Sequence, residues 1–241
     1  MSTVAKLKAL ARRRFEAERR LVIRGAGWDD YLTLVDSLHE RSPLRVAFDG
    51  KDIEIMTKGS DHDRFSYLIN QLNVAVAQAQ GVPIEPYGET TWRKPGVKRG
   101  LEADQWYFFD ARKRERIARM QRADKARGVR TNSTERFPSP DLAIEIDISP
   151  PKVDRPGIYA ALGVAELWRF DGDVAVIERL MPGGRYEPIE KSHWLESPRP
   201  TWCDGWSRKT RPNSSPGSTA SRSGPGENSR EEDHDPSHDR C

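Results

Sequence analysis

The segment 140–148, Pro-Asp-Leu-Ala-Ile-Glu-Ile-Asp-Ile, constrains the fold of this 241-residue chain more than any other stretch. Side chains of a β-strand alternate between its two faces, so one face here is entirely Leu and Ile. The other face carries Asp141, Glu145 and Asp147. Like charges this close repel one another unless a cation lies between them. Two interpretations stay open: a magnesium-type metal site with oxygen ligands, or an edge strand with a solvated acidic face.

A second segment, 100–109, favours the metal site. Its alternation places Glu102 and Asp104 on one face of another apolar strand. If the two strands are neighbours, Asp104 and Glu145 can share one cation. Phosphodiester hydrolysis needs such a metal, which polarises the phosphate, together with a nearby basic group that stabilises developing charge. Four basic residues precede the same strand: Arg93, Lys94, Lys98 and Arg99.

The remaining patterns predict helices packed against a mostly antiparallel, mixed sheet. The joint Asp49-Gly50 between the apolar runs 45–48 and 53–56 is a hairpin signal. Ser60 starts a helix with one apolar stripe that reaches Val76. Other helices are expected over 28–38 and 154–163, and strands over 84–86, 90–94, 102–109, 141–148, 164–170 and 174–180.

Composition divides the chain into three parts. Residues 1–25 are rich in Arg and Lys and are expected to form a basic helix, and residues 26–204 form the folded domain. Residues 205–241 are dominated by Ser, Gly, Pro and mixed charges, which cannot bury enough apolar surface to offset the entropy of ordering. The sequence therefore predicts a disordered tail.

A basic insertion occupies residues 111–136 of the folded domain, where ten Lys and Arg residues face three acidic ones. It is expected to be helical, and both a phosphate-binding arm and a merely solvated helix stay open. Because it connects the two acidic strands, we expect it to emerge near the site.

Several functional classes are excluded by composition. No apolar run approaches the ~20 residues of a membrane span, and the basic N-terminal stretch lacks the apolar core of a secretory signal. Two cysteines, Cys203 and Cys241, cannot supply a disulfide framework or a cysteine-based zinc site. These features predict a cytoplasmic protein with no membrane partner.

Six segments occur in the order found in one known family: GWDDYLTLVDSL, FDGKDIEIMTKGSDHDRFSYLI, GETTWRK, RGLEADQWYF, PDLAIEIDIS and DRPGIYAALGVAELWRFDG. Over about residues 26–190 the chain thereby resembles the Uma-two family of restriction endonucleases, in the PD-(D/E)XK nuclease superfamily. The resemblance implies an α/β, restriction-endonuclease-like core with a central mixed β-sheet flanked by helices. It also implies a Mg²⁺- or Mn²⁺-dependent endonuclease that hydrolyses DNA phosphodiester bonds. Asp104, Glu145 and the backbone carbonyl of Ile146 are the implied metal ligands.

One departure from the superfamily concerns its lysine, which is expected two residues after the second acid. Asp147 stands there instead, and Arg155 in the following helix is the main candidate for the missing cation. Arginine stays protonated, so it can stabilise charge and orient water but cannot act as a general base. The predicted catalytic set is Asp104, Glu145, Asp147, Arg155 and Lys94, and further candidate positions are Glu54, His62, Glu102, Asp141 and Lys152. For His62 a surface capping turn stays open as the alternative.

The implied partner is nucleic acid, with DNA expected ahead of RNA, and a homodimer stays open. The residues expected to contact nucleic acid are Arg93, Lys98, Arg99, Arg112, Lys113, Arg114, Arg116 and Arg119. A nuclease fold that has lost catalysis and binds nucleic acid or a protein is the alternative function. The missing lysine favours that alternative, whereas the three retained acids favour an enzyme, because unused buried carboxylates are costly.

Overall fold

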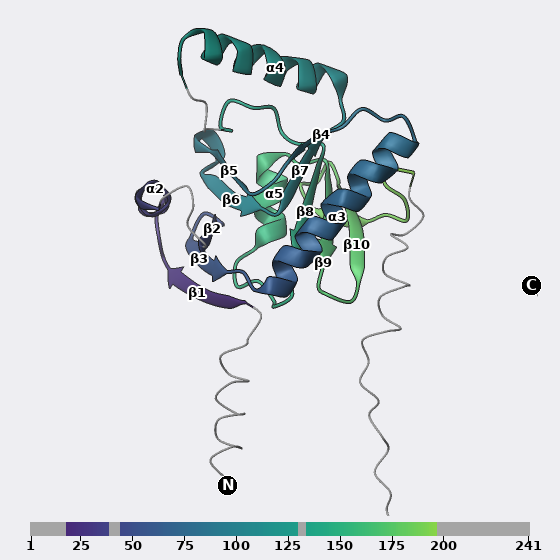
Figure 1. Cartoon of the computed structure of the whole chain (residues 1–241). Helices are drawn as coiled ribbons and strands as arrows, with labels where there is room; N and C mark the ends of the chain where they lie inside the picture. Colours follow the sequence, from purple (N-terminus) through teal and green to yellow (C-terminus); the bar gives the residue numbers. More distant parts are fainter. Residues whose placement is uncertain (1–17, 39–43, 130–133, 197–241) are drawn as a thin grey trace, which may run out of the picture. The chain divides into compact units, whose positions relative to one another are not determined.

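The computed structural model describes residues 18–38, 44–129 and 134–196, all within the first of the two units into which the chain divides (Figure 1). The predicted tail 205–241 and the first seventeen residues of the predicted N-terminal helix lie outside the described residues. Within the described ranges no helix is long and apolar enough to span a membrane.

Two β-sheets form the framework, where the sequence predicted one. The first is antiparallel throughout and has the strand order β1-β3-β2-β6-β5. Its strands are β1 (Arg19–Arg24), β2 (Leu44–Phe48), β3 (Asp52–Thr57), β5 (Thr90–Lys94) and β6 (Arg99–Ala103). The hairpin predicted at Asp49-Gly50 joins β2 to β3, and Gly50 has a φ of 96°, which favours glycine.

The second sheet is the predicted mixed sheet, with the order β11-β10-β9-β8-β7-β4. Only the β8–β9 pair is parallel among its described pairs. Its strands are β4 (Glu85–Tyr87), β7 (Gln105–Phe108), β8 (Leu142–Ile146), β9 (Glu166–Phe170), β10 (Ala175–Leu180) and β11 (Tyr186–Pro188). The predicted α/β class, a mixed sheet flanked by helices, is therefore confirmed.

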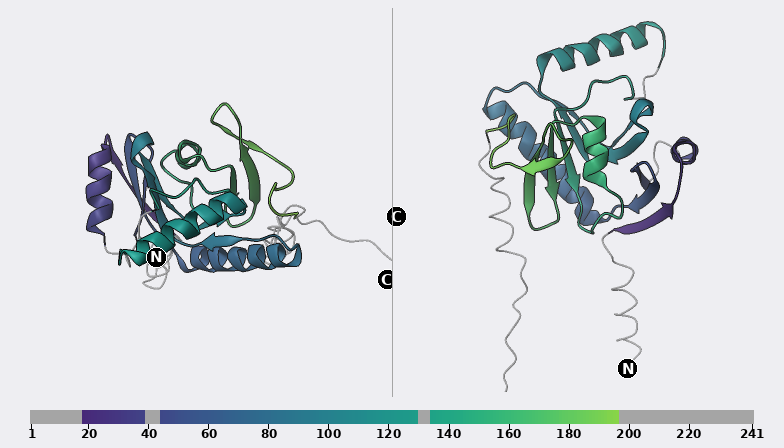
Figure 2. Two further views of the ribbon diagram at one scale, coloured as in Figure 1. Left: turned by 90° about the horizontal axis from the view of Figure 1, so that it is seen from above. Right: turned by 180° about the vertical axis from the view of Figure 1, so that it is seen from behind.

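Helices cover both faces of the second sheet (Figure 2). α3 (Ser60–Ala79) packs on the outer face against a cluster that contains Leu142, Ile144 and Ile146 of β8. α5 (Arg155–Leu162) packs on the inner face, in a core shared by both sheets. The apolar side of β8 thus faces α3, and its acidic side is turned toward α5.

The chain passes from one sheet to the other at Asp104. Ala103 ends β6 in the first sheet, and Gln105 starts β7 in the second. The strand predicted over 102–109 is therefore wrong as a single strand, because the sheets meet at this residue.

The N-terminal helix predicted for residues 1–25 is wrong where the structure describes it. Residues 19–24 form β1, which pairs antiparallel with β3 at the edge of the first sheet. Val22 and Ile23 are β-branched, and the open edge of β3 offers backbone partners that an isolated helix lacks.

The basic insertion contains the expected helix, α4 (Ala111–Ala126). The carboxylate of Asp110 caps it by accepting a hydrogen bond from the backbone N–H of Lys113 at 2.9 Å. Buried Ile117 anchors α4 to the core shared by the two sheets. The first helix along the described chain, α2 (Trp28–Ser37), covers the first sheet through Tyr31.

Candidate active site

A buried cluster of charged and hydroxyl side chains lies where the start of α3, the end of β8 and the strand β1 meet. We call it the site cluster. Its members come from segments far apart in the sequence and are joined by hydrogen bonds and ion pairs. They are Glu18, Arg20, Glu54, His62, Asp104, Glu145, Asp147, Ser149, Arg155 and Tyr159.

The two acids predicted to share a cation are neighbours. Gln105 pairs with Ile144 in the antiparallel β7–β8 register, which sets Asp104 opposite Glu145. Oδ2 of Asp104 accepts a hydrogen bond from the backbone N–H of Ile146 at 2.9 Å. Both carboxylates are buried. The expected juxtaposition of these acids on adjacent strands is present.

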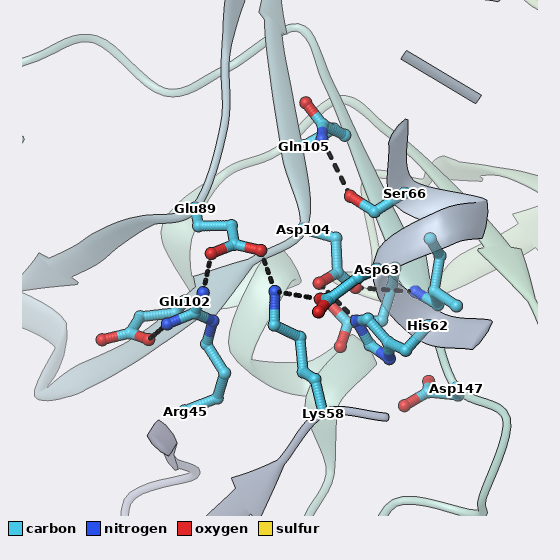
Figure 3. Close-up of polar contacts among 12 residues, drawn as sticks. Arg45, Lys58, His62, Asp63, Ser66, Glu89, Glu102, Asp104, Gln105 and Asp147 are labelled. Carbon is cyan, nitrogen blue, oxygen red and sulfur yellow. Dashed lines mark hydrogen bonds and ion pairs between the residues drawn. The ribbon is translucent and has the colours of Figure 1, made fainter. Parts of the chain in front are cut away.

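His62, in the first turn of α3, bridges two carboxylates from other segments. Its Nε2 lies 2.7 Å from Oδ1 of Asp104, and its Nδ1 lies 2.7 Å from Oε1 of Glu18. Figure 3 shows the ring and Asp104 pointing toward each other. Burial lowers the pKa of His62, but the two carboxylates outweigh it and raise that pKa to about 10. At neutral pH the ring is therefore an imidazolium that donates to both acids. The surface capping turn is wrong, because His62 is 0% exposed.

Two side chains of α5 donate hydrogen bonds to the carboxylate of Glu145. Arg155 donates to one of its oxygens and Tyr159 to the other. Burial raises the pKa of Glu145, and the charges of Asp147 and Asp104 add to that rise, while Arg155 opposes it. Burial works against the charge of Arg155, but Glu145 and Asp147 raise the pKa of the guanidinium, which stays protonated. The structure thus brings Arg155 to the acid for which the sequence predicted a cation.

Arg20 is the second arginine of the site cluster. Its guanidinium donates to Asp147 at 2.9 Å, Glu54 at 2.8 Å and Glu18 at 2.9 Å. Its Nε donates to Oγ of Ser149 at 3.0 Å. Asp147, at the position where the resemblance predicts a lysine, is therefore paired with an arginine from β1.

The site cluster carries more negative than positive charge. Its five carboxylates are Glu18, Glu54, Asp104, Glu145 and Asp147, and its three cations are Arg20, His62 and Arg155. With all groups ionised, two negative charges are left uncompensated. Burial and this excess of acid raise the pKa of Asp147 as well as that of Glu145. Among the described residues no three His, Cys, Asp or Glu side chains are already arranged around a metal position.

Comparisons with known proteins bear on this arrangement. Residues 28–208, more than half of the chain, match the Uma2 family, which is described as "Putative restriction endonuclease". The chain belongs to the Uma2 family. The resemblance to the Uma-two family seen in the sequence is thereby confirmed. Glu18 and Arg20 precede the matched range.

A solved structure is also similar to this Uma2 protein. It is the crystal structure of a "putative nuclease belonging to DUF820" from Anabaena variabilis ATCC 29413, with 17% sequence identity and a TM-score of 0.45. The match covers 75% of this chain and 92% of that one. No curated protein matches the chain.

Sequence reasoning missed Glu18 and Arg20 of this Uma2 site. Both were grouped with the basic N-terminal stretch. The available signal was the apolar run Leu21-Val22-Ile23, whose β-branched residues favour a strand over the predicted helix.

Lys94 does not lie in the site cluster, although it was predicted to be catalytic. Its ammonium donates to Oγ of Ser139 at 2.7 Å and to the carbonyl of Leu162 at 3.0 Å. In the β5–β6 register Lys94 pairs with Arg99, whereas Thr90 pairs with Ala103, the neighbour of Asp104. The length of β5 therefore separates Lys94 from the acids, and its predicted place in the catalytic set is corrected.

The other basic residues before β7 have local partners or lie on the surface. Arg93 forms ion pairs with Asp36 at 2.8 Å and Glu135 at 2.6 Å. Arg99 donates to the backbone carbonyls of Val97 and Lys98. Lys98 is exposed, in a left-handed turn with a φ of 48°.

Glu102 belongs to a second ion network beside the site cluster. Arg45 donates to Glu102 at 3.1 Å and also to Glu89, which binds Lys58 in turn (Figure 3). Lys58 also pairs with Asp63 of α3 at 3.0 Å. Glu102 is thus held by Arg45 and by the hydroxyl of Thr91, and it does not contact the site cluster through a described hydrogen bond.

The remaining predicted positions have structural contacts. Glu54 lies in the site cluster and also accepts a hydrogen bond from the backbone N–H of Lys152 at 2.6 Å. Asp141 lies at the opposite end of β8 from Glu145 and accepts from the backbone N–H groups of Phe109 and Asp110 at 2.7 Å and 2.8 Å. It therefore fixes the start of the insertion and is not a ligand of the site.

The insertion lies far from the site cluster, which contradicts the expectation that it emerges nearby. In an antiparallel pair, the connection from the end of β7 to the start of β8 lies opposite the end where Asp104 faces Glu145. From Asp104 to Asp110 an extended chain covers about 20 Å. Figures 1 and 2 show α4 at the end of β7 that is remote from the start of α3. Both ends of the insertion are tied to the acidic strands, but to their far ends.

Proposed function

We propose that this Uma2 protein is a divalent-metal-dependent endonuclease that hydrolyses phosphodiester bonds of DNA. The observation that carries the proposal is the pair of buried carboxylates, Asp104 and Glu145, opposite each other on adjacent strands. Membership of the Uma2 family supports the same reaction class.

Magnesium fits the donor chemistry and the charge of the site cluster. The two uncompensated negative charges equal the charge of one divalent cation, and Mg²⁺ prefers oxygen ligands. Asp104, Glu145 and the backbone carbonyl of Ile146 would hold it. When bound, such an ion polarises the scissile phosphate and promotes ionisation of a coordinated water.

The protein's own groups have separate tasks in this proposal. The imidazolium of His62 fixes the orientation of the Asp104 carboxylate. Arg155 stabilises negative charge that develops on the phosphate, because its guanidinium stays protonated beside Glu145. Asp147, with its side chain 11% exposed, is the carboxylate of the site cluster most open to solvent, and it accepts the proton of the attacking water.

The exposed face of α4 is assigned to the DNA backbone. Arginines at nearly every third position along it are exposed, and no ion pair within the described residues is seen for them: Arg112, Arg116, Arg119 and Arg122. Since α4 lies at the far end of β7, these contacts would involve DNA that flanks the cleaved bond.

A second candidate is a nuclease fold that binds nucleic acid without cleaving it. Two observations favour it. Asp147 stands where the superfamily has a lysine, and both oxygens of Glu145 are occupied by Arg155 and Tyr159. A metal ion would have to displace at least one of these donors.

Plasmid nicking separates the two candidates. Supercoiled DNA is incubated with the protein in Mg²⁺, Mn²⁺ or EDTA, beside Asp104→Ala and a control at exposed Glu187, Glu187→Ala. The proposed enzyme nicks DNA with metal only, loses nicking in Asp104→Ala and keeps it in Glu187→Ala. Binding without nicking in either metal would establish the second candidate. Preferential cleavage of a single-stranded RNA over a DNA strand of the same length would overturn the assigned substrate.

A further inference from the structure

The N-terminal strand contributes two side chains to the site cluster from outside the family match. Glu18 immediately precedes β1, and Arg20 lies within it. The match to the Uma2 family starts at residue 28. The matched range therefore does not contain the whole site cluster.

We propose that Glu18 and Arg20 are positioning residues of the active site, in which Glu18 fixes the His62 ring against Asp104 and Arg20 fixes Glu18 and Asp147. The assignment of Asp104 as a metal ligand belongs to the proposed function, and the inference rests on it. The contacts of the two residues carry the argument.

Glu18 is fully engaged inside the protein. Oε1 lies 2.7 Å from Nδ1 of His62, and Oε2 accepts from the backbone N–H of Ser149 at 2.9 Å and from its hydroxyl at 2.5 Å. Without Glu18, the N–H at Nδ1 of His62 would be buried with no acceptor, which is unfavourable and frees the ring to rotate. The second ring nitrogen, which holds Asp104, would move with it.

Arg20 uses the planar geometry of its guanidinium to join several segments. Its nitrogens contact three acids and a hydroxyl, from β3, from the segment after β8 and from the residue that precedes β1. A lysine in its place carries the same charge but presents a point charge, not a fork of fixed donors. Arg20 therefore fixes the positions of Glu18, Glu54 and Asp147 relative to one another, which a charge without fixed donors does not.

A purely structural role for β1 would predict the opposite orientation of its side chains. A strand that stabilises a sheet by packing turns its apolar side chains inward. Here Leu21 and Ile23 are 62% and 43% exposed, whereas the side chain of Arg20 is 3% exposed. Burying charge and exposing aliphatic side chains is unfavourable for stability alone. Six backbone pairs with β3 hold the strand independently of these side chains.

The test measures the His62 ring directly, by nitrogen-15 NMR of the full-length protein. In the wild type, both ring N–H groups are donors to buried carboxylates, so two slowly exchanging ring N–H signals are expected. Glu18→Gln, which keeps the shape of the side chain, and Arg20→Gln should shift or broaden the Nδ1 signal. Arg20→Lys should restore it only in part. The matched control is Arg24→Gln, on the same strand, where a 68% exposed arginine side chain pairs with Asp52 at 2.6 Å.

A second readout is Mg²⁺ affinity by calorimetry, which requires no catalysis. We expect Glu18→Gln to weaken Mg²⁺ binding at least tenfold while its far-UV circular dichroism spectrum stays that of the folded wild type. Wild-type ring signals in both Glu18→Gln and Arg20→Gln would overturn the inference, and so would wild-type Mg²⁺ affinity in Glu18→Gln. If the wild type nicks no DNA, the proposed function fails separately, because neither readout depends on turnover.

Discussion

Nε2 of His62 lies 2.7 Å from Oδ1 of Asp104, although 42 residues separate the two in the sequence. The contact joins the first turn of α3 to the residue at which the chain passes between the two sheets. The other oxygen of Asp104, Oδ2, accepts a hydrogen bond from the backbone N–H of Ile146, the residue after Glu145. One histidine thus sets the orientation of the carboxylate on which the proposed metal site depends.

The first prediction concerns that carboxylate. Asp104→Ala should abolish DNA cleavage and weaken Mg²⁺ binding, because it removes one of two acidic ligands. The sheets should stay folded, since β6 and β7 keep their backbone pairing on both sides of the residue. Calorimetry measures the affinity, and circular dichroism checks the fold. Mg²⁺ affinity equal to that of Glu187→Ala would rule out Asp104 as a ligand.

The second prediction concerns stability at Glu145. Relief of repulsion between acids would leave Glu145→Ala as stable as the wild type, but the buried ion pair with Arg155 changes that expectation. Removing Glu145 leaves Arg155 with only the more distant carboxylates of Glu54 and Asp147, at 3.9 Å and 3.8 Å, so we expect a loss of about 3–5 kcal/mol in the free energy of unfolding. Urea denaturation measures it.

A double-mutant cycle supplies the control for Glu145. Because Glu145→Leu combined with Arg155→Met removes both charges and keeps volume, it should be more stable than Glu145→Leu alone. Additive losses in the cycle would show that the ion pair does not couple the two residues.

These residues show how much of the candidate site can be predicted from the sequence alone. The adjacency of Asp104 and Glu145 was predictable because each stands in an alternating apolar segment, whereas Arg155 was indicated only by the family resemblance. Glu18 was not predictable, because its partner Ser149 is 131 residues away and no local pattern indicates the contact. The remote position of α4 was also missed, since the direction of a connection depends on which ends of β7 and β8 face each other.

The third prediction is an acid-dependent loss of stability that depends on Glu18. Burial alone would raise its pKa, but hydrogen bonds from His62 and Ser149 and the charge of Arg20 outweigh it and lower the pKa from 4.5 to about 2. A lowered folded-state pKa stabilises the protein above the unfolded value, and this contribution is lost as pH falls from 4.5 toward 2.

Urea midpoints measured across this pH range test the Glu18 contribution. Glu18→Gln has no proton to gain, so its stability should fall less steeply toward acid than that of the wild type. Equal slopes for the two proteins would show that Glu18 is not preferentially ionised in the folded state.

The last prediction concerns α4. Replacing Arg112, Arg116 and Arg119 with Gln should weaken DNA binding with little dependence on sequence. Each lost phosphate contact should reduce the slope of log affinity against log salt by roughly 0.9 on duplex DNA. The rate of cleavage at saturating DNA should stay unchanged, because α4 lies at the far end of β7 from Asp104.

An equal change of charge elsewhere distinguishes a phosphate contact from general attraction. Exposed Arg179, Arg185 and Lys191 lie on or beside β10 and β11, and their replacement with Gln is the matched control. If α4 binds the backbone, its variant loses more affinity and more salt dependence than the control. If both variants lose the same affinity, only net charge matters and α4 is a solvated helix. A lower cleavage rate at saturating DNA in the α4 variant would contradict its remote position.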